Sequence, residues 1–445
     1  MELKVYFETL GCAKNQVDTE VMVGIMSENK YFAIADPQEA DVIVINTCGF
    51  IESAKTESVE TILDLSEYKE HGKCKALVVT GCLAERYAES LKAEIPEVDA
   101  FVGTTQFDQI LPIVEGIFGR GLTQIHIGDI DKSFEENLPR VLSTPKHMAY
   151  LKISEGCDNL CTYCIIPKLR GKYRSRHMED IVLEAQKLVA EGVKELIIIA
   201  QDTTRYGIDL YDDYKLAELL EELNKIEGLK WIRLQYMYPD VIDEKLIGAI
   251  ASLDKVVKYV DMPIQHASDS VLKRMNRRTD QAQIRRVVTS LRDKVPHISI
   301  RTTLIVGFPG ETKEEYEALK SFVEEMKFDR LGVFAYSQEE DTPAAKMPGQ
   351  VEEDIKSERR DGIMATQISI SEERMNGLVG QNLEVVIEEV AQDDQEGLVY
   401  IGRSSFDAPE IDGVVYVHAR SKQEIGSFVH VNITDALEYD LIGEI

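Results

Sequence analysis

Glu155-Gly-Cys-Asp-Asn-Leu-Cys-Thr-Tyr-Cys164 is the most informative stretch of this 445-residue chain. Its cysteines, Cys157, Cys161 and Cys164, have the spacing C-x3-C-x2-C. Cysteine ligation of a complete four-iron cluster needs four thiolates, so three leave one iron open. The open iron can chelate the amino and carboxylate groups of S-adenosylmethionine, whose reductive cleavage gives a carbon radical. The motif therefore predicts a radical-generating iron–sulfur site.

A structural zinc knuckle is the alternative for this motif. Zinc sites favour C-x2-C pairs followed by a second pair or by two histidines. No second cysteine pair follows Cys164, and the next histidine along the chain, His177, stands alone. The spacing therefore favours a cluster over zinc.

A second set of cysteines lies near the amino terminus. Cys12, Cys48 and Cys82 each follow an apolar run, in the contexts Leu-Gly-Cys, Asn-Thr-Cys-Gly and Thr-Gly-Cys. Because ligands bind outside the carboxyl ends of parallel strands, all three thiols are expected at one sheet edge. Neighbouring glycines let the backbone turn closely around a bulky group. We therefore predict a second cluster with three ligands, and the seventh cysteine, Cys74, fits neither set.

The bulk composition is that of a globular protein with several domains. The hydrophobic content is 44%, and no apolar run approaches the ~18 residues of a membrane span. The first residues lack the basic region and cleavage site of a signal peptide. Seven cysteines without a secretion signal indicate reduced thiols or metal ligands, which favours the cytoplasm. The net charge of −29 favours basic partners over phosphate backbones.

Three domains are expected, giving a multidomain α/β fold. Residues 1–130 alternate short apolar runs with amphipathic segments, which predicts a parallel α/β domain. Its expected strands are 3–8, 41–46, 76–80 and 100–102, with a helix at 16–28. The polar stretch 131–147 contains two prolines and is expected to be a linker.

Residues 148–376 repeat the alternation as six β/α units, which predicts a partial (β/α)6 barrel rather than a complete eight-fold one. The expected strands are 149–154, 195–200, 231–235, 259–262, 298–305 and 331–336. The expected helices include 180–191, 214–225 and 313–326, and a polar connecting helix at 352–376. From 377 to 445 only short strands are expected, at 383–390, 397–401, 414–417 and 428–433, which favours a small closed β-barrel of the OB type.

Polar and glycine-rich segments follow the predicted barrel strands, where catalytic residues of β/α barrels lie. We expect Tyr163, Gln201 and Gln265 to contact S-adenosylmethionine. Gly307 allows close backbone approach to a nucleoside, and Arg301 is expected to pair with the cofactor carboxylate.

A basic run follows the cluster motif, at Lys168, Arg170, Lys172, Arg174 and Arg176. Such runs are commonly solvated faces. In so acidic a chain, the run is equally well explained as a site that binds a carboxylate of the substrate or cofactor.

Together these features resemble the radical S-adenosylmethionine methylthiotransferases, and the resemblance covers the whole chain. It implies that Cys12, Cys48 and Cys82 hold an auxiliary 4Fe-4S cluster that carries or receives sulfur. It implies that Cys157, Cys161 and Cys164 hold the radical-generating 4Fe-4S cluster. S-adenosylmethionine then serves both as methyl donor and as radical source. The terminal β-barrel corresponds to the family's TRAM domain.

The family has two branches, which differ in substrate. One modifies an adenosine of transfer RNA, and the other, the RimO branch, modifies an aspartate β-carbon on protein twelve of the small ribosomal subunit. Residues 377–445 hold 14 Asp and Glu against 3 Lys and Arg, the wrong sign for binding RNA and the right sign for a basic ribosomal protein. The segment 402–413 and Gln201-Asp202 also resemble the RimO branch. Asp407, Glu410 and Asp412 are expected to dock the substrate.

Two further functional classes are compatible with parts of the sequence. A two-cluster electron carrier without catalysis is disfavoured by the open irons and the glycines at the barrel mouth. A plain acidic protein-binding module is disfavoured by the two cysteine sets. The enzyme interpretation implies a reductant protein and a sulfur donor as additional partners, without a membrane.

Overall fold

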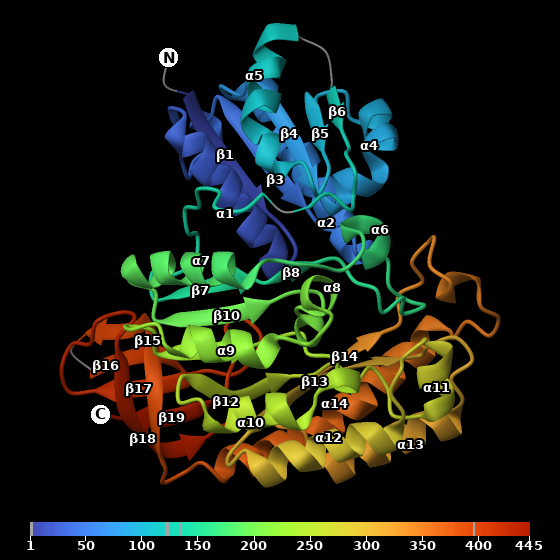
Figure 1. The fold of residues 1–445 in the computed structure, drawn as a ribbon, viewed down its shortest axis with the longest axis vertical. Coiled ribbons are helices and arrows are strands. Elements are labelled where there is room, and N and C mark those ends of the chain that lie inside the picture. Colours follow the sequence, from blue (N-terminus) through green and yellow to red (C-terminus); the bar gives the residue numbers. More distant parts are fainter. Residues whose placement is uncertain (1–2, 121–123, 134, 395–396) are drawn as a thin grey trace.

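The computed structural model describes residues 3–120, 124–133, 135–394 and 397–445. Figure 1 shows the amino-terminal domain above the barrel domain, with the terminal β-barrel at one side. Two sheets of six parallel strands and one closed five-stranded barrel make up the fold. The predicted fold class is thereby confirmed. No helix among the described residues is long and apolar enough to span a membrane.

The amino-terminal domain is a parallel sheet with helices on both faces, in the strand order β2-β1-β3-β4-β5-β6. The central strands β3 and β4 are buried along their whole length, which explains their continuous apolar sequence. The strands are β1 (Leu3–Thr9), β2 (Tyr31–Ala33), β3 (Val42–Thr47), β4 (Ala76–Gly81), β5 (Ala100–Val102) and β6 (Gln124–His126). The helices are α1 (Ala13–Glu28), α2 (Glu52–Ser66), α3 (Tyr68–His71), α4 (Cys82–Glu94) and α5 (Ile110–Arg120).

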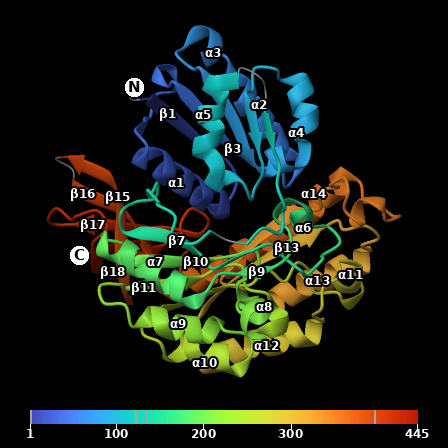
Figure 2. The same cartoon turned by 45° about the horizontal axis from the view of Figure 1, so that its top comes forward.

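The barrel domain has the strand order β14-β13-β12-β11-β10-β7, without a pairing between β14 and β7 among the described residues. Figure 2 shows the helices along its outer side. The strands are β7 (Met148–Lys152), β10 (Glu195–Ile199), β11 (Trp231–Leu234), β12 (Val256–Asp261), β13 (Ser299–Val306) and β14 (Arg330–Ala335), with the short pair β8 (Ser154–Glu155) and β9 (Arg174–Ser175). The helices are α6 (Ile166–Arg170), α7 (Met178–Ala190), α8 (Ile208–Tyr211), α9 (Leu216–Asn224), α10 (Glu244–Ser252), α11 (Asp269–Arg274), α12 (Gln281–Lys294), α13 (Lys313–Met326) and α14 (Glu353–Asn376).

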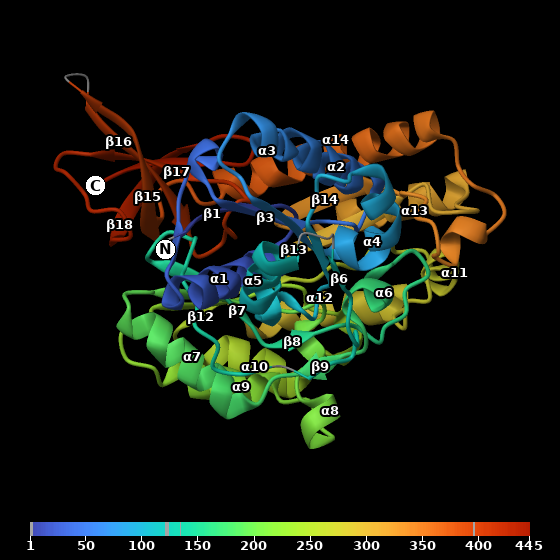
Figure 3. The same ribbon diagram turned by 90° about the horizontal axis from the view of Figure 1, so that it is seen from above.

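The terminal barrel closes in the order β15-β16-β17-β19-β18. Its strands are β15 (Asn382–Asp394), β16 (Gly397–Ser404), β17 (Val415–Ala419), β18 (Phe428–Ala436) and β19 (Leu441–Glu444). Figure 3 shows this barrel projecting to one side of the other two domains. The predicted domain boundaries stay predictions, although the described residues between β6 and β7 contain neither helix nor strand.

Buried ion pairs attach the terminal barrel to the barrel domain. Arg403 of β16 pairs with Glu195 of β10 at 2.5 Å, and Arg233 of β11 pairs with the same carboxylate at 2.8 Å. Trp231, the sole tryptophan of the chain, packs edge-on against Phe428 of β18 at 4.7 Å between ring centroids. This contact makes the tryptophan fluorescence a probe of the domain interface.

The Arg403→Met variant is expected to unfold at lower urea concentration than the wild type, with a loss of about 3–5 kcal/mol in the transition that Trp231 reports. The reason is that removing one partner leaves Glu195 buried with a single cation. Arg420→Met removes the same charge from an exposed position of the same barrel, so it should leave the transition unchanged. Equal effects of the two variants would contradict a structural role for the buried pair.

The stability difference between the wild type and Arg403→Met is expected to shrink below about pH 4.3. Burial alone would raise the pKa of Glu195, but Arg403 and Arg233 outweigh it and lower the pKa to about 2. Because the pKa of Glu195 in the folded chain lies below the unfolded value of about 4.3, the ionised carboxylate contributes its full stabilisation above pH 4.3. This contribution to the free energy of unfolding is lost as the pH falls toward 2. Urea unfolding of the metal-free chain at a series of pH values measures this convergence.

Candidate functional site

The amino-terminal cysteines lie where the sequence predicted them, at the carboxyl edge of the parallel sheet. Cys12 precedes α1, Cys48 follows β3, and Cys82 begins α4 directly after β4. Because Thr47 pairs with Gly81 in the sheet, Cys48 and Cys82 leave neighbouring strands at the same level.

Two glycines allow these loops to approach one another closely. Gly11 has a φ of 92°, and a Cβ there would approach the Cβ of Cys48 to 2.9 Å. Gly81 has the same φ, and a Cβ there would lie 2.3 Å from the Asn46 side-chain oxygen. Asn15 ties the loops further, since its amide donates to the carbonyls of Leu10 and Thr47 at 2.9 and 3.0 Å.

The loop that carries Cys157, Cys161 and Cys164 is fixed by backbone hydrogen bonds to the barrel. The Cys157 amide donates to the Gly171 carbonyl at 3.1 Å, and the Thr162 amide donates to the Met275 carbonyl at 3.0 Å. Tyr163 packs within an apolar cluster with Phe308, at 6.5 Å between ring centroids. The cysteines are therefore presented by a rigid loop rather than by a free segment.

All six cysteines of the two sets line one cavity of about 360 Å³ between the amino-terminal domain and the barrel. Gln201, Tyr236 and Gln265, from segments that follow barrel strands, line it as well. Cys74 is 6% exposed and packs in a separate core of the amino-terminal domain. The sequence predicted two sites, and the fold brings them to one space.

Burial raises the pKa of three of the cavity thiols. It raises the pKa of Cys82 and of Cys157 to about 12, and it raises the pKa of Cys164 above its usual range. Thiols with such pKa values stay protonated at neutral pH until a cationic metal displaces the proton. Loading of metal at this site therefore releases protons.

The donor set fits two clusters and one nucleoside cofactor. Each triplet of sulfur donors matches cluster ligation with one open corner. The side-chain oxygens of Gln201 and Gln265 are buried without a hydrogen-bond partner among the described residues, and both residues line the cavity. Such acceptors are satisfied when a ligand donates to them.

Arg301 requires a correction, because it does not line the cavity. It lies in the first half of β13, and its guanidinium pairs with Asp261 at 2.9 Å and with Asp412 of the terminal domain at 3.3 Å. The expected pairing with a cofactor carboxylate is therefore replaced by a contact between domains.

Gly307 is also absent from the cavity lining. Its φ of 71° favours glycine, and a Cβ there would lie 2.3 Å from the side chain of Lys356 on α14. Close packing of α14 explains this glycine, whereas the expected approach to a nucleoside does not.

Two of the three expected docking residues point inward. Asp407 is 2% exposed and pairs with Arg330 of β14, and the Asp412 carboxylate accepts from the Tyr259 hydroxyl at 2.7 Å. Glu410 is exposed. The surface-docking role expected of Asp407 and Asp412 is corrected to attachment of the terminal barrel, and that of Glu410 stays a prediction.

The basic run splits into exposed and buried residues. Lys168 and Lys172 are exposed, whereas Arg170 is 2% exposed and pairs with Asp18 at 2.7 Å and Glu155 at 3.1 Å. Its partners are carboxylates of the protein itself, which neither alternative from the sequence had anticipated. Through Asp18, Arg170 joins the amino-terminal domain to the barrel beside the cysteines.

The cavity residues that the sequence did not single out include Lys14, Asn15 and Arg277. Lys14 and Asn15 lie in the first turn of α1, where polar residues ordinarily face water. Their burial results from the barrel domain, which is far away in sequence. The one available signal is their closeness to Cys12.

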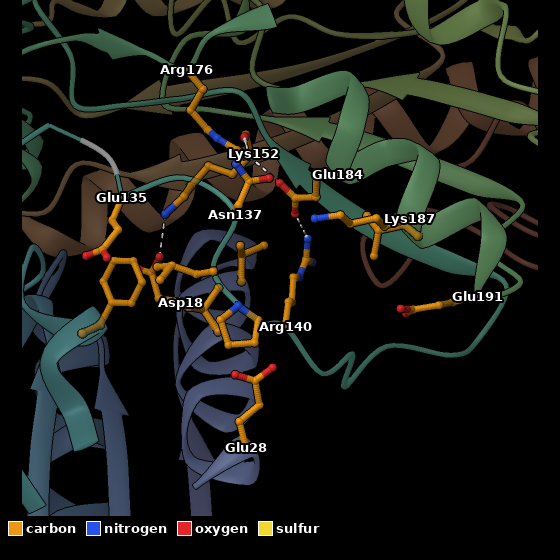
Figure 4. Close-up of a pocket in the computed structure, with 16 residues that line it drawn as sticks. Asp18, Glu28, Glu135, Asn137, Arg140, Lys152, Arg176, Glu184, Lys187 and Glu191 are labelled. Atoms are coloured by element: carbon orange, nitrogen blue, oxygen red, sulfur yellow. Dashed lines mark hydrogen bonds and ion pairs between the residues drawn. The ribbon is translucent and has the colours of Figure 1, made fainter. Parts of the chain in front are cut away.

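A cavity of about 480 Å³ lies between α1, the connecting segment and α7 (Figure 4), but none of the site cysteines lines it. Its central charges are paired. Lys152 pairs with Asp18 of the amino-terminal domain at 2.5 Å, Arg140 of the connecting segment pairs with Glu184 at 2.7 Å, and Arg176 pairs with Glu184 within the barrel domain at 2.6 Å. Because these groups satisfy one another, the pairs are interpreted as the joint between two domains.

Comparison with known families divides the chain into the three parts that the structure shows. Residues 4–103 match the Uncharacterized protein family UPF0004, residues 151–323 match the Radical SAM superfamily, and residues 379–445 match the TRAM domain. Two structures of the radical S-adenosylmethionine methyltransferase TsrM from Kitasatospora setae are similar in fold. The structure with cobalamin and a [4Fe-4S] cluster has a TM-score of 0.54 at 14% identity and covers 77% of this chain and 74% of its own. The structure with the tryptophan substrate and an S-adenosylmethionine analogue has a TM-score of 0.56 at 13% identity and covers 88% of this chain and 79% of its own.

Curated relatives match over the full length. "Ribosomal protein uS12 methylthiotransferase RimO" of Clostridioides difficile (strain 630) is 54% identical over 100% of this chain and 99% of its own. The protein of the same name from Thermoanaerobacter sp. (strain X514) is 50% identical over 98% of both. With these identities and the three matched domains, the chain belongs to the ribosomal protein uS12 methylthiotransferase RimO family.

Proposed function

We propose that this protein transfers a methylthio group to the β-carbon of an aspartate in ribosomal protein uS12. The observation that carries the proposal is the single cavity lined by both cysteine triplets. Radical formation and sulfur delivery must act on the same carbon, so the two sites have to open into one space. A transfer-RNA substrate, the alternative from the sequence, is not favoured by full-length relatives named for uS12.

The cysteines divide the work between the two domains. Cys157, Cys161 and Cys164 hold the cluster that binds S-adenosylmethionine, and Cys12, Cys48 and Cys82 hold the auxiliary cluster. When bound, these cofactors supply a carbon radical and the methylthio group. Glycine at position 11 lets the Cys12 and Cys48 loops touch, which keeps the second triplet compact.

Other lining residues orient the ligands and exclude water. The unpartnered oxygens of Gln201 and Gln265 accept hydrogen bonds from the cofactor, and Tyr163 closes one wall against Phe308. The Gln201 amide donates to Glu155, which fixes its oxygen toward the cavity. Phe50, Met237 and Pro263 add apolar surface to the lining, which protects a radical from solvent.

The surface charge fits the substrate and its partners. The terminal domain remains strongly acidic outside the pairs formed by Asp407 and Asp412, which suits a basic ribosomal protein and opposes nucleic acid. A reductant protein and a sulfur donor complete the reaction, because neither electrons nor sulfur atoms for repeated turnover come from the chain.

Mass spectrometry of purified uS12 tests the proposal. The anaerobically reconstituted protein is incubated with uS12, S-adenosylmethionine, reductant and sulfide, and a parallel reaction contains transfer RNA. A mass increase of one methylthio group on a single aspartate of uS12, with unmodified transfer RNA, is the expected result. Modification of transfer RNA alone would overturn the proposal.

A further inference from the structure

The cavity that both cysteine sets line is cationic. Three of its lining residues, Lys14, Arg170 and Arg277, carry positive charge, and no Asp or Glu belongs to the lining. The chain as a whole has a net charge of −29, so this local excess runs against the composition. Such a lining selects anionic groups among the ligands that enter.

Two of the three cations already have partners. Arg170 pairs with Asp18 and Glu155 behind the cavity wall. Arg277 donates to the Pro263 carbonyl at 2.6 Å, stacks on Tyr238 at 3.7 Å and reaches the Cys161 sulfur at 3.9 Å. Arg277 thus lies beside the cysteines at which the amino acid end of S-adenosylmethionine is expected.

Lys14 differs from both. It is 7% exposed, and its ammonium makes neither an ion pair nor a hydrogen bond with any of the residues that the structure describes. Its recorded contact is the ring of Tyr236, whose centroid lies 3.3 Å from the nitrogen. A cation–π contact contributes roughly 0.5–2 kcal/mol, which is less than the several kcal/mol that withdrawing an ammonium from water costs. The ammonium lines the cavity and therefore has a position open for an anionic partner.

The position of Lys14 indicates which anion completes it. Lys14 comes two residues after Cys12 on the amino-terminal domain, and the ring beneath it belongs to the segment after β11 of the barrel. It therefore lies where the sulfur-carrying domain faces the radical-generating one. The carbon that receives sulfur must enter between these domains, and the aspartate carboxylate is bonded directly to that carbon.

We propose that Lys14 binds the side-chain carboxylate of the substrate aspartate and so makes the enzyme select aspartate over its neutral isostere. This assignment rests on the proposed function and adds a specificity-determining residue to it. A charge-assisted hydrogen bond in a buried site holds the β-carbon in place, and an amide in the same position cannot replace the charge.

The experiment compares the binding of uS12 with that of a uS12 variant whose modified aspartate is asparagine. Wild-type enzyme, reconstituted with its clusters and saturated with S-adenosylmethionine, should bind the aspartate form about 10- to 100-fold more tightly. Lys14→Met should bind both forms equally, and Lys14→Arg should restore part of the preference. Lys168→Met, which removes an exposed lysine near the cluster loop, is the matched control and should keep the wild-type ratio.

Two further readouts identify other roles for Lys14. A raised KM for S-adenosylmethionine in Lys14→Met with an unchanged aspartate preference would assign the lysine to the cofactor carboxylate and overturn the proposal. Iron falling from about eight to about four per chain would assign it to the auxiliary cluster and overturn it too. If the wild type modifies uS12 and Lys14→Met still discriminates, only this inference fails; if the wild type modifies no uS12, the proposed function fails with it.

Discussion

Replacing Cys157, Cys161 or Cys164 with Ala is expected to abolish deoxyadenosine formation, whereas replacing Cys12 with Ala is expected to spare it and stop methylthiolation. The first loss should be at least about 10³-fold, because no protein side chain replaces the chemistry of the cofactor. The two triplets lie in different domains, so loss of one ligand leaves the other loop intact. Chromatography of deoxyadenosine and mass spectrometry of uS12, from the same anaerobic reaction, measure both outcomes.

Cys74→Ala is the control for this pair of experiments. Cys74 is buried in the core of the amino-terminal domain, and its sulfur lies 3.4 Å from the Ala76 carbonyl oxygen. Its replacement should cost about 1 kcal/mol of stability and leave both reactions unchanged. Methylthiolation by Cys12→Ala at the wild-type rate would exclude the amino-terminal triplet as the sulfur-delivering site.

The regular elements of this chain could be predicted because their hydrophobic patterns are strong. The helix expected at 313–326 coincides with α13, and the strand expected at 100–102 coincides with β5. The sequence analysis missed the strand β19, because this strand has four residues, two of which are a glycine and a glutamate, and so carries little periodic hydrophobic signal. The edge strands β2 and β6, three residues each, were missed for the same reason.

The cysteine sets were predictable, but their meeting was not. Matched positions after successive parallel strands place Cys12, Cys48 and Cys82 at one edge by topology alone. Which face of the barrel domain this edge covers depends on contacts such as Arg170 with Asp18, which join residues 152 positions apart. No local pattern encodes such a pairing.

The error at Arg301 has the same origin. An arginine in a barrel strand is a reasonable partner for a cofactor carboxylate, but its actual partner, Asp412, comes from the terminal domain. The notable burial of Asp407 and Asp412 follows from the same interface. In an acidic domain, sequence does not distinguish the carboxylates that face solvent from those that face a neighbouring arginine.

Arg170→Met is expected to lower the stability of the native domain arrangement by about 3–5 kcal/mol. Arg170 is the buried cation that joins Asp18 of α1, Glu155 of the barrel and the Asn15 side chain. Without it, two buried carboxylates share Lys152 alone, which costs more than the lost contacts themselves. Hydrogen exchange of α1 and thermal unfolding of the metal-free chain measure the loss.

Neutralising one of the two carboxylates should recover part of this loss, because the destabilisation arises from unbalanced charge rather than from missing volume. The double variant Arg170→Met with Asp18→Asn is therefore expected to be more stable than Arg170→Met alone, although Asp18→Asn by itself destabilises the wild type. Lys172→Met, which removes an exposed charge two residues along the same run, should leave α1 exchange unchanged. Simple additivity of the Arg170 and Asp18 substitutions would show that the pair does not join the domains, and exchange in α1 would then have to depend on Arg140 and its ion pair with Glu20 of α1.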